Sequence, residues 1–176
     1  MSEIVTVAEK KHEKFLRQKT VDFDFSNYSA KEIRELVRRM RDVMHKAQGI
    51  GLSANQIGLT CRVFVAHVPD GEGKLKFYAV FNPQLSRPSK ETEELEEGCL
   101  SVPEKWGLVE RHYRVMLTGK DYRNKPLKIK AWGLLARVFQ HEVDHLDGKL
   151  FIDRAKEVHE APKSDRLKAR EEKLKE

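Results

Sequence analysis

The feature that most constrains this chain is a late helical segment whose apolar stripe ends in two histidines. Residues 132–147 have helical periodicity, and Gly148 follows them as a helix stop. The stripe consists of Leu134, Val138, His141 and His145. Residues at this spacing lie on one side of a helix, so both imidazole rings should be buried. A buried histidine needs a polar partner, and we predict that the fold brings one to this helix.

The two histidines belong to the pattern H-E-x-x-H, which residues 141–145 complete as H-E-V-D-H. Side chains four residues apart lie one turn above each other, so the two imidazoles can bind one metal ion. Glu142 projects beside them, close enough to take a proton from metal-bound water. Chance occurrence, or a histidine pair bonded to backbone carbonyls, is the alternative interpretation.

A metal site of this kind needs a third protein ligand. Proteases that add a third histidine after a glycine are excluded, because Phe151 occupies that position. Cys99 is an upstream candidate, since a thiolate with two imidazoles suits zinc or ferrous iron. We interpret Cys61 as a small buried apolar residue. The downstream acidic candidates are Asp153, Glu157 and Glu160. A different metallohydrolase with an acidic third ligand, such as an endopeptidase, therefore remains open here.

Composition narrows the class of protein. The 176 residues are 39% hydrophobic and 35% charged, which is typical of one soluble globular domain spanning residues 1–176. No apolar run reaches the roughly 20 residues of a membrane span, and there is no apolar signal core, so we expect a cytoplasmic protein. The formal net charge of +6 leaves a basic, non-enzymatic binding module as a further alternative.

The remaining chain predicts an α+β fold. A capping-box pair, Ser29 and Glu32, opens an amphipathic helix that Gly49 ends. Strand patterns then cover residues 62–68, 77–81, 111–117 and 127–131, with turn residues at 70–73 and 121–126. A charged tail from about residue 154 should be helical at its end. Because helices and strands are segregated along the chain, antiparallel sheets are favoured over repeated βαβ units.

Residues 49–56 read G-I-G-L-S-A-N-Q and follow the first helix. They match neither a phosphate-binding loop nor a dinucleotide fingerprint. Small residues in such a turn let the backbone approach a ligand or another strand closely. Gln56 could present an amide N–H to an oxyanion, although a surface or capping glutamine is the commoner role.

Three segments together resemble the peptide deformylase family: residues 49–56, 97–101 (E-G-C-L-S) and 140–148 (Q-H-E-V-D-H-L-D-G). They match that family's three motifs in order and in approximate spacing. One departure is Ser53, where alanine is commoner in the family.

The resemblance implies antiparallel sheets packed around a central C-terminal helix that carries H-E-x-x-H. It implies that Cys99, His141 and His145 bind one divalent metal ion, ferrous iron in many members and zinc in others, with nickel or cobalt as further possibilities. Water would be the fourth ligand and, as hydroxide, the nucleophile. Glu142 would act as general base and then as acid. The side-chain amide of Gln56 and the backbone N–H of Leu100 would hold the oxyanion.

The resemblance also implies a substrate, an N-formylmethionyl peptide, whose methionine would enter an apolar pocket. The residues placed around the substrate are Gly49, Ile50, Gly51, Leu95, Gly98, Leu134 and Val138. The peptide backbone would add as a strand beside residues 49–51. Since deformylases act on chains emerging from ribosomes, residues 163–175 are a candidate contact for ribosomal RNA, with a solvated helix as the alternative. We expect no membrane contact and no sequence-specific nucleic-acid site.

Overall fold

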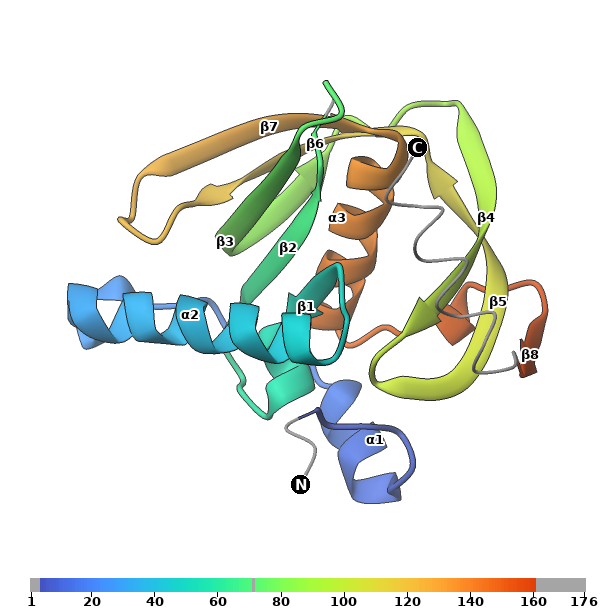
Figure 1. Cartoon of the computed structure of the whole chain (residues 1–176), viewed down its shortest axis with the longest axis horizontal. Helices are drawn as coiled ribbons and strands as arrows, with labels where there is room; N and C mark the ends of the chain where they lie inside the picture. The colour runs from blue at the N-terminus through green and yellow to red at the C-terminus, as the bar shows by residue number, and fades with distance from the viewer. Residues whose placement is uncertain (1–3, 71, 161–176) are drawn as a thin grey trace.

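The computed structural model describes residues 4–70 and 72–160. Helices and strands alternate irregularly along the chain (Figure 1). The helices are α1 (Lys10–Leu16), α2 (Ala30–Lys46) and α3 (Gly133–Leu146), with short 3-10 turns η1 (Phe25–Asn27), η2 (Ala54–Ile57) and η3 (Phe151–Asp153). The strands are β1 (Gly51–Ser53), β2 (Val63–Pro69), β3 (Leu75–Ser86), β4 (Thr92–Cys99), β5 (Val102–His112), β6 (Arg114–Lys120), β7 (Pro126–Trp132) and β8 (Val158–Glu160).

The strands form two antiparallel sheets with α3 between them. One sheet has five strands in the order β1-β2-β3-β6-β7, and the other has three in the order β4-β5-β8. In Figure 1, α3 stands in the middle, with the larger sheet on one side and β4 and β5 on the other. Helix α3 contacts strands of both sheets. The predicted α+β class and the central position of the H-E-x-x-H helix are therefore confirmed.

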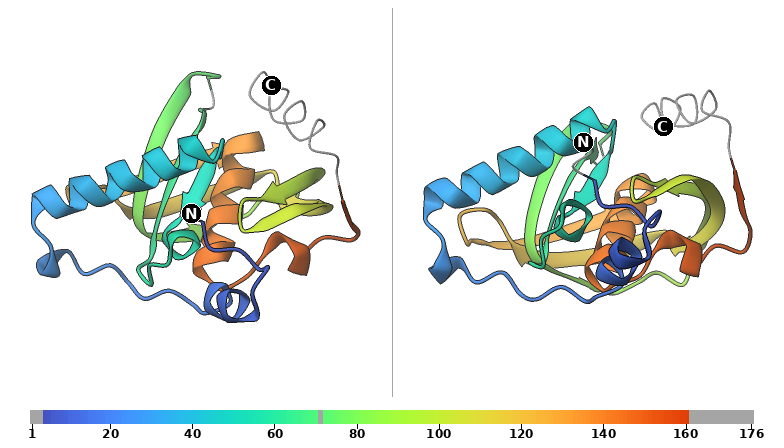
Figure 2. Two further views of the ribbon diagram at one scale, coloured as in Figure 1. Left: turned by 60° about the horizontal axis from the view of Figure 1, so that its bottom comes forward. Right: turned by 90° about the horizontal axis from the view of Figure 1, so that it is seen from below.

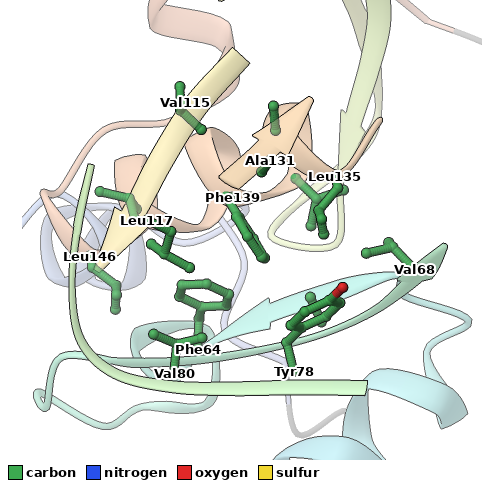
Figure 3. Packing of buried hydrophobic residues seen from close by; sticks show 14 residues of the cluster. Phe64, Val68, Tyr78, Val80, Val115, Leu117, Ala131, Leu135, Phe139 and Leu146 are labelled. Atoms are coloured by element: carbon green, nitrogen blue, oxygen red, sulfur yellow. The ribbon is translucent and has the colours of Figure 1, made fainter. Parts of the chain in front are cut away.

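The main hydrophobic core lies between α3 and the larger sheet. Phe139 of α3 packs against Phe64 and Tyr78, with ring centroids 5.7 and 5.4 Å away (Figure 3). Leu117 and Leu146 close the same cluster, and neither is exposed. Burying each such side chain stabilises the fold by about 1.5–3 kcal/mol, so this packing fixes α3 relative to the sheet.

Helix α2 begins as the sequence predicts. Ser29 Oγ accepts from the Glu32 N–H, and the Glu32 carboxylate accepts from the Ser29 N–H, which completes the capping box. The helix ends two residues before Gln48, whose φ of 55° turns the chain, and the Gly49 N–H then donates to the Met44 carbonyl. Its apolar face packs on β1 and β2 in a second core cluster.

The strand prediction is confirmed for β2, β3 and β7, but the single strand predicted over residues 111–117 is wrong. The chain leaves the three-stranded sheet at His112, the end of β5, and enters the five-stranded sheet at Arg114, the start of β6. Tyr113 between them donates its N–H to Glu91 and accepts from Gly133. Side chains alternate between exposed and more buried from the end of β5 into β6, so the sequence pattern does not reveal that the chain changes sheets here.

The N-terminal segment, which the sequence left unassigned, packs against the C-terminal end of α3 (Figure 2). The Thr20 N–H and hydroxyl both donate to the Leu146 carbonyl at 2.9 Å. A Cβ on Gly148 would lie 2.3 Å from the Arg17 carbonyl oxygen, and Gly148 has a φ of 74°. Only glycine allows this approach with the chain turning left-handed, so Gly148 both ends α3 and admits the N-terminal segment.

The charged tail predicted from about residue 154 does not begin as a helix. Residues 154–160 contain no helix, and Val158–Glu160 form β8 at the edge of the smaller sheet. The helical prediction for residues 161–176 lies outside the described residues. Within the part of the chain that the structure describes, no helix has the length and apolar character needed to cross a membrane.

Candidate metal centre

Three potential metal ligands converge where the smaller sheet meets α3. Cys99 ends β4, while His141 and His145 lie one turn apart on α3. Their ligand atoms lie within 4.8 Å of one another, and Cys99 Sγ is 3.1 Å from His145 Nε2. The predicted burial holds for His145, which is 1% exposed, whereas His141 is partly exposed toward a cavity. The structure thus brings together all three predicted ligands.

The tautomer of His141 is set by a carboxylate behind it. Its Nδ1 lies 3.0 Å from Glu97 Oε2, and because an ionised carboxylate only accepts, Nδ1 must be the donor. This leaves Nε2 of His141 as the atom available to a cation. Such carboxylate–histidine pairs are typical of metal sites, where they orient the ring and raise the basicity of the ligand.

The charges around the centre fit a cation. Burial raises the pKa of the Cys99 thiol, but the imidazoles of His145 and His141 outweigh burial and lower this pKa to about 5. A thiolate is the form of cysteine that binds metals. His145 Nδ1 is buried without a hydrogen-bond partner among the described residues, so the ring's one polar side-chain contact there is the Cys99 sulfur. One thiolate and two imidazoles suit zinc or ferrous iron.

Glu97 is a functional residue that the sequence reasoning did not identify. It is 4% exposed and accepts two hydrogen bonds from Arg111, at 2.8 and 2.9 Å, and one from Arg137 at 2.8 Å. Burial acts to raise its pKa, but the bonds from Arg111 and His141 hold it well below the usual range. The arginines come from β5 and α3, far along the chain, so no local pattern reveals this anchor.

Glu142 lies beside the ligands and is itself buried. Its Oε2 is 2.7 Å from Ser53 Oγ, and burial raises the pKa of its carboxyl group. The raised pKa makes the group a better proton acceptor than an exposed glutamate, as general bases require. Glu142 therefore lies beside the two histidines, as the sequence predicts.

Gln56 caps a 3-10 turn and lies beside the candidate metal ligands. Its side chain caps η2, because Oε1 accepts from the Ser53 N–H at 2.9 Å. This bond directs Nε2 toward the centre, 3.1 Å from Ser101 Oγ and 3.6 Å from Cys99 Sγ. The amide is 2% exposed and held at both ends, so it presents an N–H beside the ligands without reorganisation.

A cavity of about 490 Å³ opens over Cys99 and His141, and the buried His145 lies behind them. The predicted substrate residues that line it are Gly49, Ile50, Gly51, Gly98, Leu134 and Val138, together with Gln56 and Leu100. Leu95 is not among the described residues that line the cavity. Sequence reasoning missed Trp106, which lies so close to Gly98 that a Cβ there would be 3.0 Å from the indole ring.

The acidic alternatives for the third ligand do not reach the centre. Asp153 accepts from Arg17 at 2.9 Å and from the Leu150 N–H at 2.8 Å. Glu157 and Glu160 are exposed, and neither belongs to the ligand cluster in the described part of the chain. Cys61 packs in the second core cluster, away from the ligands, where burial raises its pKa.

This chain is similar to known proteins in sequence and in fold. The family model described as polypeptide deformylase matches residues 1–161. A peptide deformylase of Pelotomaculum thermopropionicum is 46% identical over 133 residues, covering 74% of this chain and 81% of the relative. The crystal structure of the Thermotoga maritima peptide deformylase has a TM-score of 0.77 at 34% identity and covers 89% of this chain and 99% of that chain.

A second solved structure, the class I type b peptide deformylase of Acinetobacter baumannii with Met-Ala-Ser bound, has a TM-score of 0.78 at 28% identity. It covers 86% of this chain and 96% of that chain. The similarity thus extends over sequence and fold, and the matched residues include the three that converge at the metal centre. This chain belongs to the polypeptide deformylase family.

Proposed function

We propose that this chain hydrolyses N-formylmethionyl peptides to formate and a peptide with a free amino terminus, at the centre formed by Cys99, His141 and His145. Deformylation of such peptides is the activity of the polypeptide deformylase family. The observation that carries the residue assignment is the convergence of one sulfur and two ring nitrogens within 4.8 Å beneath a cavity.

The three ligand residues would hold one divalent ion, and we propose ferrous iron, with zinc, nickel or cobalt as substitutes. When bound, such an ion polarises the formyl carbonyl and lowers the pKa of water from near 16 toward about 7. Glu97 supports this assignment, because it fixes the tautomer in which His141 Nε2 is free. The lowered pKa of Cys99 supports it as well, since the thiolate is the form that binds a metal.

Glu142 would move the proton. Its Oε2 is bonded to Ser53, so Oε1 is the oxygen left to accept a proton from the attacking water. The carboxyl group would then give that proton to the methionine nitrogen as the C–N bond breaks. One water is consumed, formate leaves, and Glu142 returns to its ionised form.

Two N–H groups would stabilise the negative charge that develops on the formyl oxygen. One is the Gln56 amide, which Ser53 and Ser101 hold beside Cys99. The other is the backbone N–H of Leu100, which follows Cys99 directly and lines the same cavity. Removing one such donor typically lowers the rate about 100- to 1,000-fold.

The substrate would lie between the two sheets. Among the described residues, strand β1 lies at the edge of its sheet and pairs only with β2, so its other side can accept an added strand from the peptide. Ile50, Leu134 and Val138 line the cavity with apolar surface suited to an unbranched methionine side chain. Trp106 adds an aromatic wall on the side of the smaller sheet.

The test is formate release from formyl-Met-Ala-Ser by protein purified without oxygen and loaded with iron or nickel. We expect turnover that a chelator abolishes. Glu142→Gln should retain one metal ion per chain and lose nearly all activity, because the amide cannot accept the proton. Absence of turnover by the metal-loaded wild type would refute the proposed function, and normal turnover by Glu142→Gln would refute the assigned base.

We also propose that the protein acts in the cytoplasm on chains leaving the ribosome, with residues 163–175 contacting ribosomal RNA. That segment carries six Lys or Arg and three Asp or Glu, so its net charge favours a polyanion. A chain ending at residue 160 should co-sediment less with ribosomes at low salt. Unchanged co-sedimentation would exclude the tail as the contact.

A further inference from the structure

Two residues on the same side of strand β1 lie against the Glu142 side chain. Gly51 and Ser53 are two apart, so both point toward α3. Ser53 Oγ lies 2.7 Å from Glu142 Oε2, and Ser53 has no exposed surface. A Cβ on Gly51 would lie 2.2 Å from Glu142 Oε1. One carboxylate oxygen is therefore bonded to a hydroxyl, and the other lies against bare backbone beside the cavity.

The Ser53 hydroxyl has a second partner on the same residue. Its Oγ is also 2.9 Å from the backbone carbonyl oxygen of Glu142. A hydroxyl carries one hydrogen, so it can donate to only one of these two oxygens at a time.

We propose that Ser53 is a positioning residue that keeps the Glu142 carboxyl group in one orientation, with Oε1 directed toward the cavity. This inference rests on the proposed function of Glu142 as the base. The Ser53 hydroxyl donates to Oε2 and also lies within hydrogen-bonding distance of the Glu142 carbonyl oxygen, so it ties the carboxyl group to the backbone of its own residue.

Because Ser53 occupies Oε2, the carboxyl group cannot rotate without losing this bond, and Oε1 stays directed toward the cavity. Ser53 keeps its own hydrogen throughout and is not itself consumed. Alanine at this position, the commoner residue in the resemblance drawn from the sequence, can provide neither bond.

The backbone of Ser53 has a separate role that a substitution leaves in place. Its N–H donates to Gln56 Oε1, and every residue except proline retains that donor. Replacing the serine side chain therefore removes the bonds to Glu142 and leaves the support of Gln56 intact. This separation makes the hydroxyl testable on its own.

The experiment compares Ser53→Ala and Ser53→Cys with the wild type in the metal-loaded, full-length chain. Cysteine fills the space but is a weak donor, so it separates loss of the hydroxyl from loss of volume. Thr20→Val is the matched control, because the Thr20 hydroxyl also donates to a carbonyl of α3, that of Leu146, at 2.9 Å. The readouts are kcat, KM, metal per chain and the Glu142 side chain in crystal structures.

We expect both Ser53 variants to lower kcat about ten-fold, the low end of what a hydrogen bond to a charged group contributes, with KM and metal content unchanged. In the Ser53→Ala crystal structure, Glu142 should occupy more than one orientation. Thr20→Val should retain the wild-type kcat.

Wild-type kcat in Ser53→Ala would overturn the inference, as would a fall in kcat that Thr20→Val shares or that lost metal explains. Recovery of activity by Ser53→Cys alone would assign the effect to volume and also overturn it. Failure of the proposed function is distinguishable, because the wild type itself would then release no formate.

Discussion

At the scale of single residues, Glu97 holds one of the three candidate ligands in place. Glu97 is buried, bonded to Arg111 and Arg137, and holds His141 Nδ1 at 3.0 Å. It therefore fixes a rotamer and a tautomer before any metal arrives. Preorganisation of this kind reduces the cost of binding a cation, since the ring does not have to be ordered.

Glu97→Gln tests this anchor. The amide keeps the shape but removes the charge that faces two arginines and His141, so we expect metal affinity to fall about 10- to 100-fold. The free energy of unfolding of the metal-free protein should fall by about 3 kcal/mol, because two buried guanidinium groups lose a partner. Chelator competition and urea unfolding measure the two effects. Wild-type metal affinity in this variant would contradict the assigned role.

At the scale of elements, the close approach of β1 to α3 decides where Glu142 lies. The second glycine of the G-I-G turn, Gly51, permits that approach, because a Cβ there would overlap the carboxylate. The sequence reasoning assigned Gly51 to the substrate side and did not relate it to Glu142. That relation is a contact between strand and helix 91 positions apart (142 − 51), and local patterns carry no information about it.

Gly51→Ala should therefore displace the Glu142 carboxylate. A shift of about 1 Å in a catalytic group can lower the rate about 100-fold, and we expect a fall in kcat of that order with metal content unchanged. Gly58→Ala is a matched control, because a Cβ on Gly58 meets no atom within 4 Å, although its φ of 81° disfavours alanine. Equal kcat values for Gly51→Ala and the wild type would contradict this prediction, because the Glu142 carboxylate would then remain functional beside the added methyl group.

The elements that the sequence predicted well are those with one buried face. Helices α2 and α3 have clear apolar stripes, and the β2–β3 hairpin has turn residues between two apolar strands. Strand β4 was not predicted, because it carries the glutamates 93, 94, 96 and 97, of which only Glu97 is buried. Only tertiary pairing with β5 makes this segment a strand.

The site was predictable where its residues form local motifs and not where they meet through folding. Cys99 and the two histidines follow from the three motifs, whereas Glu97, Arg111 and Trp106 depend on how the smaller sheet packs against α3. Leu95 illustrates the same limit, since its assignment to the pocket came by analogy and it does not line the cavity among the described residues.

At the scale of the whole molecule, a buried ionic network joins the smaller sheet to α3. Glu97 of β4 and Asp144 of α3 share Arg111 of β5, and Asp144 also accepts from Arg154 beyond the helix. Burial acts to raise the pKa of Asp144, but Arg154 and Arg111 hold it below the usual range, as arginines do for Glu97. The network therefore links stability to pH.

The direction of the pH effect on stability follows from the lowered pKa values of Glu97 and Asp144. A carboxyl group whose pKa is lower in the folded state stabilises that state above its unfolded pKa, which is 4.5 for Glu97 and 3.8 for Asp144. Below those values the unfolded state takes up protons first, so the free energy of unfolding of the metal-free protein should fall as pH drops below about 4.5. Urea unfolding between pH 7 and pH 3 measures this, and constant stability across that range would contradict the network's role.

X-ray absorption at the metal edge of the active, zinc-loaded protein tests the central claim most directly. One thiolate and two imidazoles should give one sulfur at about 2.3 Å and nitrogen or oxygen neighbours at about 2.0–2.1 Å. Cys99→Ser should remove the sulfur shell. A wild-type spectrum with nitrogen and oxygen neighbours only would contradict the joint ligation by Cys99, His141 and His145 on which the proposed hydrolysis depends.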